Sequence, residues 1–469
     1  MKYYAGKSEL ELNEMRTAEA KERDAAYEKL SAELGEDAVD ALKAHFAIYD
    51  ERVYLWVASL YDPGEYDADG NPLGGGFYYT KSAKETDGYA IDIESTEQVF
   101  SFLSECGMLR GKRNDVLPEK MIKEVVAFAH SLQSPDDGYF YHKQWGKDIG
   151  SSRQSRDLGW ATHLLSAFGY QPYWNAPDGT KGIYGEPGKK TESQSEPLNV
   201  DKWPDRLKTL EAWEQYLKNF EPEIATRSYP IGHEVAEQSS QIKNRDAEAL
   251  ANGEPTGYVA LTEHYFNKWR NKETGLWEDK VTFSSVNGLM KIMAIYVALG
   301  LRFEYATEAF ESVLKLIALE DTDESGVKLI ASTFIYNPWC ALSRIFNCLK
   351  SQGDTALLDE LRARLRNEAA RLIRITTKKT KKFQKPDGSY GFRLDYSHSH
   401  QQGVPSAVPN TVEGDIDGGL IAVNAVTLHM MIALGIYKTV YIYYPSDLYV
   451  FLEELSKNEH KDKKIVSKL

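Results

Sequence analysis

Apolar helices that end at glycine recur along the chain, and each follows a short turn made of glycine and an aromatic residue. The turns are Gly76-Phe77-Tyr78, Asp137-Gly138-Tyr139, Gly275-Leu276-Trp277 and Asp387-Gly388-Ser389-Tyr390. The apolar stretches end at Gly107, Gly169, Gly300 and Gly435. Glycine ends a helix readily because it adopts the left-handed backbone conformation. A unit repeated four times predicts one architecture for most of the chain and outweighs any single motif.

Two kinds of helix alternate in this pattern. One kind is apolar nearly all round and rich in small residues, which is typical of a helix buried on most faces. The other kind carries charge on one face, as in residues 118–132 and 357–373. An inner ring of apolar helices surrounded by amphipathic partners fits this alternation. We therefore predict an all-α fold, an (α/α)6-type toroid of inner and outer helices with long loops over one mouth.

Helical periodicity continues through most of the chain. Two leading helices are predicted within residues 1–60, followed by a Gly- and Tyr-rich loop at 62–91. Further helices are predicted at 92–106, 117–133, 157–168, 205–220, 234–250, 257–270, 286–299, 303–319, 335–350, 354–376, 417–434 and 446–457. Long loops are predicted at 134–156, 170–204 and 378–416, and structureless loops over about 15 residues are usually functional. The basic run 378–385 is expected to be a solvated loop, with a phosphate or polyanion contact as the alternative.

Composition and charge narrow the class of protein. The chain has 469 residues, 42% apolar and 12% aromatic, and no linker divides it, so 1–469 is expected to be one domain ending in a helix and tail at 440–469. The net charge of −14 disfavours nucleic acid and anionic membrane as partners. No signal peptide is recognisable, and no apolar run approaches the length of a membrane span. The three cysteines lie in apolar stretches and are expected to be buried free thiols in a cytoplasmic protein.

Acidic residues begin two of the repeat-related helices. Asp92 and Glu94 stand at the first of these helices, and Asp415 and Asp417 stand at the last. Aspartate is a favoured N-cap, and carboxylates suit the positive end of the helix dipole. A helix start needs only one cap, so the second acid of each pair is free to point into a cavity. We therefore expect one acid of each pair to face the same cavity as a catalytic pair, within about 10 Å of each other.

The loop before the last acidic pair supplies candidate proton-transfer groups. Tyr396 with His398 can remove a proton next to a carboxylate, provided that Asn337 or Arg153 neutralises that carboxylate. His398 and His400 share a face of an extended loop, but no third ligand of matching type accompanies them, so no metal is predicted. The chain also has no Gly-rich phosphate loop, dinucleotide fingerprint or nucleophile elbow, so no cofactor is predicted.

Aromatic and polar residues near the turns and helix starts are candidates for substrate binding. The chain has 29 tyrosines, more than a core needs, and tyrosine suits a wet cleft because it joins an apolar body to a polar tip. Packing between helices is the alternative role for each of these residues. The substrate-binding candidates are Tyr78, Tyr139, Arg153, Asp157, His233, Trp277, Asn287, Asn337 and His400.

The turns SPDDGYFYH, NKETGLWED and KPDGSYGFR, each leading to an apolar helix, resemble the repeats of α/α-toroid proteins. That superfamily includes terpenoid cyclases, protein prenyltransferases, six-hairpin glycosidases and toroid polysaccharide lyases. The resemblance implies fold far more than function. The stretch Asp415–Gly418 is similar to the Asp-rich motif of class II terpene cyclases, whose middle Asp donates a proton, but departs from it at Gly418. The DGSY turn and the Tyr/His loop look more like toroid lyases and glycosidases.

Three functions remain open from the sequence. We favour a carbohydrate-active enzyme, a glycoside hydrolase or uronate lyase acting on oligosaccharides in the ring cavity, because tyrosine and tryptophan stack on sugar rings. The alternative is a terpene-cyclase-like enzyme in which Asp417 protonates an alkene in a dry cavity. The third possibility is a non-catalytic toroid that binds a ligand. A cavity lined by polar groups and acids would favour sugar chemistry, and one lined by apolar aromatic side chains would favour cyclisation.

Overall fold

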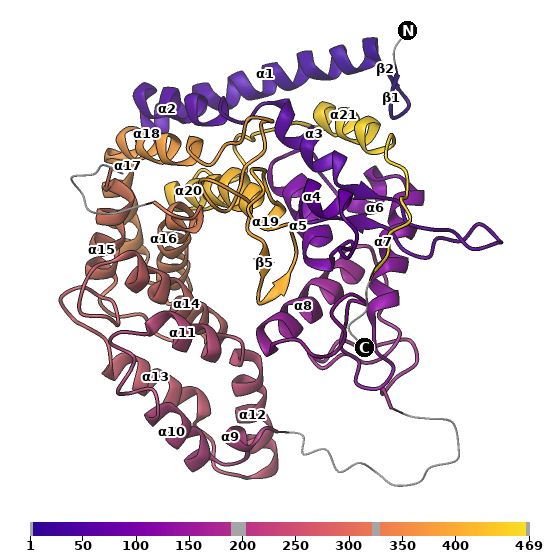
Figure 1. Ribbon diagram of the computed structural model, residues 1–469. Helices are drawn as coiled ribbons and strands as arrows, with labels where there is room; N and C mark the ends of the chain where they lie inside the picture. Colours follow the sequence, from indigo (N-terminus) through magenta and orange to yellow (C-terminus); the bar gives the residue numbers. More distant parts are fainter. Residues whose placement is uncertain (1–2, 189–202, 321–328, 466–469) are drawn as a thin grey trace.

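The computed structural model describes residues 3–188, 203–320 and 329–465, and it is mostly helical (Figure 1), which confirms the predicted helical class. The helices are α1 (Glu9–Leu34), α2 (Glu36–Phe46), α3 (Glu51–Ser59), α4 (Lys81–Glu85), α5 (Ile93–Glu105), α6 (Arg113–Val116), α7 (Glu119–Leu132), α8 (Ser151–Ala167), α9 (Asp205–Lys208), α10 (Leu210–Lys218), α11 (Ser228–Ala236), α12 (Ser239–Asn252), α13 (Tyr258–Lys268), α14 (Phe283–Leu299), α15 (Ala306–Ala318), α16 (Thr333–Ser351), α17 (Thr355–Asn367), α18 (Ala369–Lys381), α19 (Ile416–Gly419), the π-helix η2 (Leu420–Ala425), α20 (Val426–Leu434) and α21 (Pro445–Leu455). The strands form short antiparallel pairs: β1 (Tyr3–Tyr4) with β2 (Lys7–Ser8), β3 (Tyr61–Asp62) with β4 (Gly76–Phe77), and β5 (His400–Gln401) with β6 (Val404–Pro405).

The Gly-aromatic turns at the second and third repeats share one backbone geometry. In the second turn the amide of Ser134 donates a hydrogen bond to the carbonyl of Tyr139 at 2.7 Å. In the third, the amide of Asn271 donates to the carbonyl of Leu276 at 2.8 Å. The two bonds span the same number of residues and close the same loop, so the sequence repeat corresponds to a repeated local structure.

The apolar helices end at glycine as predicted. Gly300 and Gly435 are themselves left-handed C-caps, with φ of 68° and 75°. Gly107 and Gly169 come directly after the C-cap residue and also have positive φ, 101° and 76°. A side chain at such a position would meet the following carbonyl, which is why glycine ends these helices.

Several predicted boundaries are corrected by the structure. The leading region forms the three helices α1, α2 and α3, whereas two were predicted. The predicted helix 354–376 is two helices, α17 and α18, which meet at Glu368. Helix α8 begins at Ser151, inside the predicted loop 134–156. Part of the predicted loop 170–204 lies outside the described residues.

The basic run 378–385 also differs from the expected solvated loop, because α18 continues into it. Lys379 Nζ donates a hydrogen bond to the carbonyl of Ile317 at 3.1 Å, near the end of α15. Lys385 Nζ donates to the carbonyl of Arg393 at 2.9 Å. Lysine at the end of a helix satisfies carbonyls that lack intrahelical partners. These two lysines therefore have a structural role.

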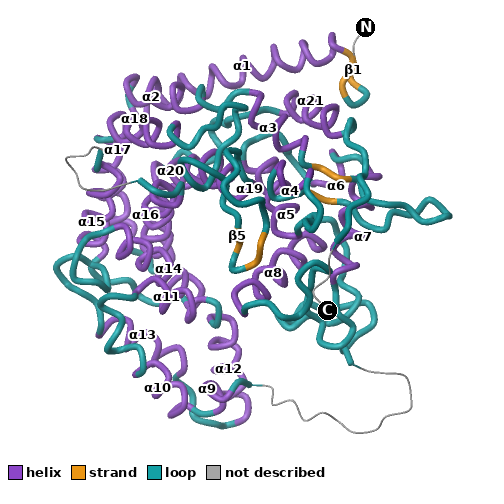
Figure 2. The backbone as a smooth tube through the Cα atoms, in the orientation of Figure 1, coloured by secondary structure: helices purple, strands orange, loops and turns teal. Residues whose placement is uncertain are grey.

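The apolar helices pack against one another in a continuous series. Helix α8 packs on α5, α5 on η2, α20 on α16, α16 on α14, and α14 on α11. Amphipathic helices pack against members of this series: α7 packs on α8, and α15 on α16. In Figure 1 the apolar series follows around the centre of the view, and the β5–β6 hairpin reaches into this centre. Figure 2 shows this hairpin as a short strand pair within the long loop between α18 and α19.

One continuous helical segment, Ile416–Leu434, is long and apolar enough to cross a membrane by length and composition. This corrects the expectation that no such run exists in the chain. The segment comprises α19, η2 and α20, and 61% of its most apolar window is buried inside the protein. A buried core helix meets the same criteria, and its packing on α16 gives it that role here.

Candidate active site

A cavity of about 540 Å³ lies where the β5–β6 hairpin meets the apolar helices, and we call it the hairpin cavity. Helices α5, α8, α11, α14 and α16 and the segment α19–η2–α20 all contribute side chains to its lining. Each of the four glycine-ended helices therefore reaches the same cavity. Polar and aromatic side chains are mixed in the lining; among them are Gln98, Trp160, Tyr229, Asn337, Gln401 and Asp417.

Asp415 is the N-cap of α19 and is fully buried. Its carboxylate accepts hydrogen bonds from the backbone amides of Gly418 at 2.5 Å, Phe392 at 2.9 Å and His398 at 3.0 Å. Burial raises the pKa of Asp415 to about 6, and the three amide bonds oppose that rise. All three of these hydrogen bonds hold the backbone, so capping explains this residue.

Asp417, two residues further along, faces the hairpin cavity and is 9% exposed. Burial, followed by the nearby Glu94 carboxylate, raises the pKa of Asp417 to about 7, while Arg156 opposes the rise. A carboxyl group that is still partly protonated near neutral pH can donate a proton, as in enzymes that separate acid and base roles by environment. The predicted division of labour within this pair is therefore present: one acid caps the helix and the other faces the cavity.

The first acidic pair differs from the second, because neither Asp92 nor Glu94 lines the hairpin cavity, and the prediction that one of them faces it is wrong. Asp92 is the N-cap of α5 and accepts a hydrogen bond from the amide of Glu94 at 2.7 Å. Glu94 forms ion pairs with Arg156 and with Arg153, the latter at 3.4 Å. Gln401 also donates to Glu94 Oε1, at 3.2 Å. Glu94 is therefore beside Asp417 but buried behind Arg156, which itself lines the cavity.

Arg153 joins the two helix starts from within the core. Its guanidinium is fully buried and lies 2.8 Å from Asp92 Oδ1 and 2.8 Å from Asp157 Oδ1. These carboxylates raise the pKa of Arg153 against the effect of burial, so the side chain stays charged. Arg153 was predicted to neutralise a substrate carboxylate. In the structure its contacts are with the protein's own carboxylates and it does not line the cavity.

Asp92, His142 and Asp157 have potential ligand atoms close enough to hold a metal ion. The backbone amide of Ile93 donates to His142 Nε2 at 3.1 Å, so this nitrogen is an acceptor and Nδ1 carries the proton. Nδ1 lies 3.3 Å from Asp157 Oδ2. His142 Nδ1 makes no hydrogen bond at this distance, but Arg153 already supplies the positive charge among these carboxylates, so the cluster is explained as a buried ionic network without a metal ion.

The Tyr396–His400 loop is partly at the cavity. His398 lines the hairpin cavity, where its ring stacks on Phe392 with centroids 4.8 Å apart. Burial lowers the pKa of His398, which makes the neutral imidazole the main form at neutral pH. Tyr396 is 41% exposed and does not line the cavity. His400 lies on β5 with an exposed side chain, next to Ser399.

Of the other predicted substrate-binding residues, Asn337 lines the cavity. It donates a hydrogen bond to Asn287 Oδ1 at 2.7 Å, which places Asn287 directly behind it. His233 on α11 pairs with Glu237 at 3.0 Å. Burial, followed by Lys291 and Arg156, lowers the pKa of His233 to about 4, so it lies near the cavity's positive charges.

The aromatic candidates from the turns lie away from the hairpin cavity. Trp277 is fully buried in the core, and its indole N–H donates to the carbonyl of Phe266 at 2.7 Å. Tyr139 is a partly buried residue of its turn. Tyr78 lines a different cavity, of about 440 Å³, and donates to Asp62 at 3.3 Å. None of these three side chains lines the hairpin cavity.

Three cationic residues of the cavity were missed from the sequence: Arg156, Lys291 and Arg344. Lys291 and Arg344 are single basic residues within apolar stretches of α14 and α16. A lone charge inside an otherwise apolar helix is the signal that would have identified them, because such a charge needs a partner or a polar cavity.

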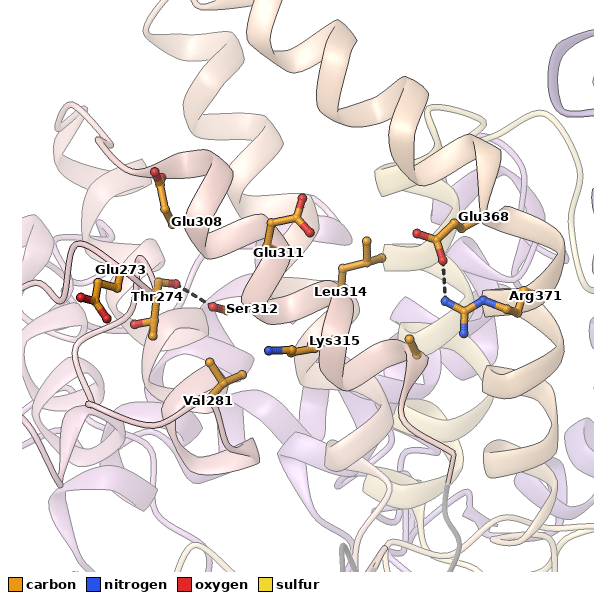
Figure 3. A pocket seen from close by; sticks show the side chains of 11 residues that line it. Glu273, Thr274, Val281, Glu308, Glu311, Ser312, Leu314, Lys315, Glu368 and Arg371 are labelled. Atoms are coloured by element: carbon orange, nitrogen blue, oxygen red, sulfur yellow. Dashed lines mark hydrogen bonds and ion pairs between the residues drawn. The ribbon is translucent and has the colours of Figure 1, made fainter. Parts of the chain in front are cut away.

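A further cavity, of about 430 Å³, is formed by α15, the start of α18 and residues of the preceding Gly-aromatic turn (Figure 3). In Figure 3, Ser312 Oγ donates to the carbonyl of Thr274 at 2.7 Å, and Glu368 pairs with Arg371. Glu311 is paired with an arginine of α17. No predicted site residue lines this cavity, so it is a weaker candidate than the hairpin cavity.

The three cysteines, Cys106, Cys340 and Cys348, are buried and free, as predicted. No family model, curated protein or solved structure matches the chain. Its function is therefore inferred from the residues and geometry of the hairpin cavity.

Proposed function

We propose that the protein is an α/α-toroid enzyme that cleaves glycosidic bonds of oligosaccharides in the hairpin cavity. The apolar helices α5, α8, α11, α14, α16 and the segment α19–η2–α20 would form the inner ring, since each contributes to one cavity. The observation that carries the proposal is the position of Asp417, a buried acid with a pKa raised to about 7 that opens onto this cavity.

Asp417 would act as the proton donor to the leaving oxygen. Glycosidases use a carboxylic acid of raised pKa for this step and a second group for the attack or for proton removal. For hydrolysis, the second group would be the carboxylate of Glu94, which does not line the cavity and would reach the attacking water only if Arg156 moved aside. In elimination from a uronate, His398 would accept the proton from the sugar carbon. Its lowered pKa keeps the imidazole neutral, so that a ring nitrogen is free to take the proton. Asp417 has the same role in both reactions.

The cavity lining favours sugar chemistry over terpene cyclisation. Amides that can bind sugar hydroxyls, from Gln98, Asn337 and Gln401, stand beside rings on which a sugar can stack, such as Trp160. Cyclisation of an isoprenoid needs a dry cavity lined mainly by aromatic side chains. The amide and cationic side chains of this cavity are unsuited to a carbocation intermediate, because positive charges repel it and polar groups can react with it.

The proposal is tested by incubating the purified chain with a panel of neutral and uronate-containing oligosaccharides. Products are identified by mass spectrometry and ultraviolet absorbance. Gain of one water per cleavage indicates hydrolysis, and an absorbing unsaturated product of unchanged total mass indicates elimination. Linear isoprenoids form a second panel. Conversion of an isoprenoid to a cyclic product, with every oligosaccharide left intact, would overturn the proposal.

A further inference from the structure

Two positively charged side chains of the hairpin cavity form no ion pair within the part of the chain that the structure describes. Lys291 on α14 and Arg344 on α16 line the cavity from helices that pack against each other. Among the described residues, neither forms an ion pair with a carboxylate. Arg344 donates one hydrogen bond to the carbonyl of Met290, and Lys291 Nζ lies 5.6 Å from the ring centroid of Tyr229.

These cations are placed at an electrostatic cost. Burial, followed by repulsion from Arg156 and Arg344, lowers the pKa of Lys291 to about 8, while the more weakly acting Glu237 carboxylate opposes this shift. Repulsion between like charges in a partly buried site destabilises the protein unless something compensates. Such an arrangement is typical of a site that is complete only when an anion is bound.

Of the described acids near the cavity, none forms an ion pair with Lys291 or Arg344. Glu237, whose charge opposes the lowering of the Lys291 pKa, lies 3.0 Å from His233 Nε2 instead. Glu94 is already paired with Arg153 and Arg156. Glu105 accepts a hydrogen bond from Asn424, and burial raises its pKa. Asp417 is partly protonated at neutral pH, as described above. The positive charge of Lys291 and Arg344 is therefore left for a ligand.

We propose that Lys291 and Arg344 bind an anionic substituent of the saccharide, a carboxylate or a sulfate, and so select acidic oligosaccharides. This inference rests on the proposed function and names its substrate class. Arg344 offers a planar fork of donors that suits the two oxygens of either group, and Lys291 adds a compact charge beside it. A neutral saccharide would leave both cations uncompensated, so the site discriminates against it.

The chain offers a matched set of variants for the test. Lys291→Met and Arg344→Met remove the charge and keep an unbranched stem. Lys291→Arg keeps the charge and should retain binding. Lys350→Met removes a charge from an exposed position of α16 and is the control. Because the two cavity cations are unpaired, the methionine variants should melt no earlier than the wild type.

Binding is measured by calorimetry in an Asp417→Asn background, which separates binding from cleavage. The probes are a galacturonic acid trisaccharide, a sulfated disaccharide and a neutral galactose trisaccharide. At least one acidic probe should bind about 10-fold or more tightly than the neutral one. Each methionine variant should bind that acidic probe about 10-fold more weakly, as expected for the loss of a charge-assisted contact. The stronger acidic probe identifies the substituent as carboxylate or sulfate.

Equal binding of the neutral and acidic probes would overturn the inference, as would variants that keep the discrimination. That failure is distinct from failure of the proposed function. If neutral oligosaccharides are cleaved and Asp417→Asn abolishes the cleavage, the proposed function stands and the anion site is wrong. Lys291- and Arg344-dependent binding of an acidic saccharide that is never cleaved would support the anion site and contradict the catalytic proposal.

Discussion

Gln401 Nε2 donates a hydrogen bond to Glu94 Oε1 at 3.2 Å, joining two residues that are 307 positions apart in the chain. Gln401 belongs to the β5–β6 hairpin, and Glu94 to the first turn of α5. Gln401 also interacts with Asp417 and opposes the rise of its pKa. One amide thus connects the hairpin, the first repeat helix and the proposed proton donor. The relative position of these three elements is the basis of the proposed active site.

Arg153→Met should destabilise the protein strongly. The substitution leaves three carboxylates, those of Asp92, Glu94 and Asp157, without their shared buried cation. Removing one partner of a buried ion pair typically costs about 3–5 kcal/mol. Chemical denaturation should show a loss of this size, whereas Arg302→Met, at an exposed pair, should change stability by less than about 0.5 kcal/mol.

The same substitution has an expected pH dependence. Arg153 lowers the pKa of Asp92 below its ordinary value of 3.8. A lowered folded pKa stabilises the fold above the ordinary value, and this contribution is lost as the pH falls. The difference in the free energy of unfolding between wild type and Arg153→Met should therefore become smaller below about pH 4. A difference that stays constant down to the acid unfolding transition would contradict the account of this network.

Replacing Gly275 should destabilise the protein more than replacing Gly300, because Gly275 also packs closely against another helix. Both have positive φ, 67° and 68°. A Cβ at Gly275 would lie 2.3 Å from the backbone nitrogen of Ala309, whereas nothing lies within 4 Å of a Cβ at Gly300. Alanine at either site should cost about 1–2 kcal/mol for the left-handed conformation. Gly275→Ala should cost about 1–3 kcal/mol more, because the turn cannot move away from α15. Equal losses in denaturation would show that the turn is not tightly packed.

The two candidate proton-transfer residues of the loop should behave differently. His398 lines the cavity, so His398→Ala should lower kcat by about 10²-fold or more if it takes part in proton transfer. Tyr396 is exposed, so Tyr396→Phe should leave kcat and KM unchanged. The steady-state rates of both variants provide the check, with circular dichroism as the folding control. A large loss in Tyr396→Phe would mean that the loop moves over the substrate.

The fold was more predictable from the sequence than the site. Glycine leaves a clear local signal, so the ends of α14 and α20 at Gly300 and Gly435 were predicted correctly. Helix breaks were predicted less well: α17 and α18 meet at Glu368, which has no helix-breaking character. Tertiary packing decides such breaks, and a single sequence does not show it.

The site was predicted in part because capping follows local rules. Asp415 and Asp92 are caps, as the preference of aspartate for helix starts implies. The position of Asp417 at the cavity followed from the reasoning that one cap is enough, but the same reasoning was wrong for Glu94, which does not line the cavity. The role of Arg153 was not predictable, because its partners come from α5 and from its own helix. Long-range ion pairs depend on which helices become neighbours, and the repeat pattern alone does not give that order.

The central claim, that Asp417 is the proton donor, is tested most directly by the pH profile of Asp417→Asn against wild type on a cleaved oligosaccharide. The folded pKa of Asp417 is raised to about 7, so its protonated form is complete at lower pH and is lost as the pH rises. Wild-type kcat should therefore fall above about pH 7. Asp417→Asn should lower kcat by about 10²–10⁴-fold, with little change in binding, and should remove that limb, while Asp395→Asn at an exposed site should behave as wild type. A folded Asp417→Asn protein with wild-type kcat and an unchanged pH profile would contradict the account.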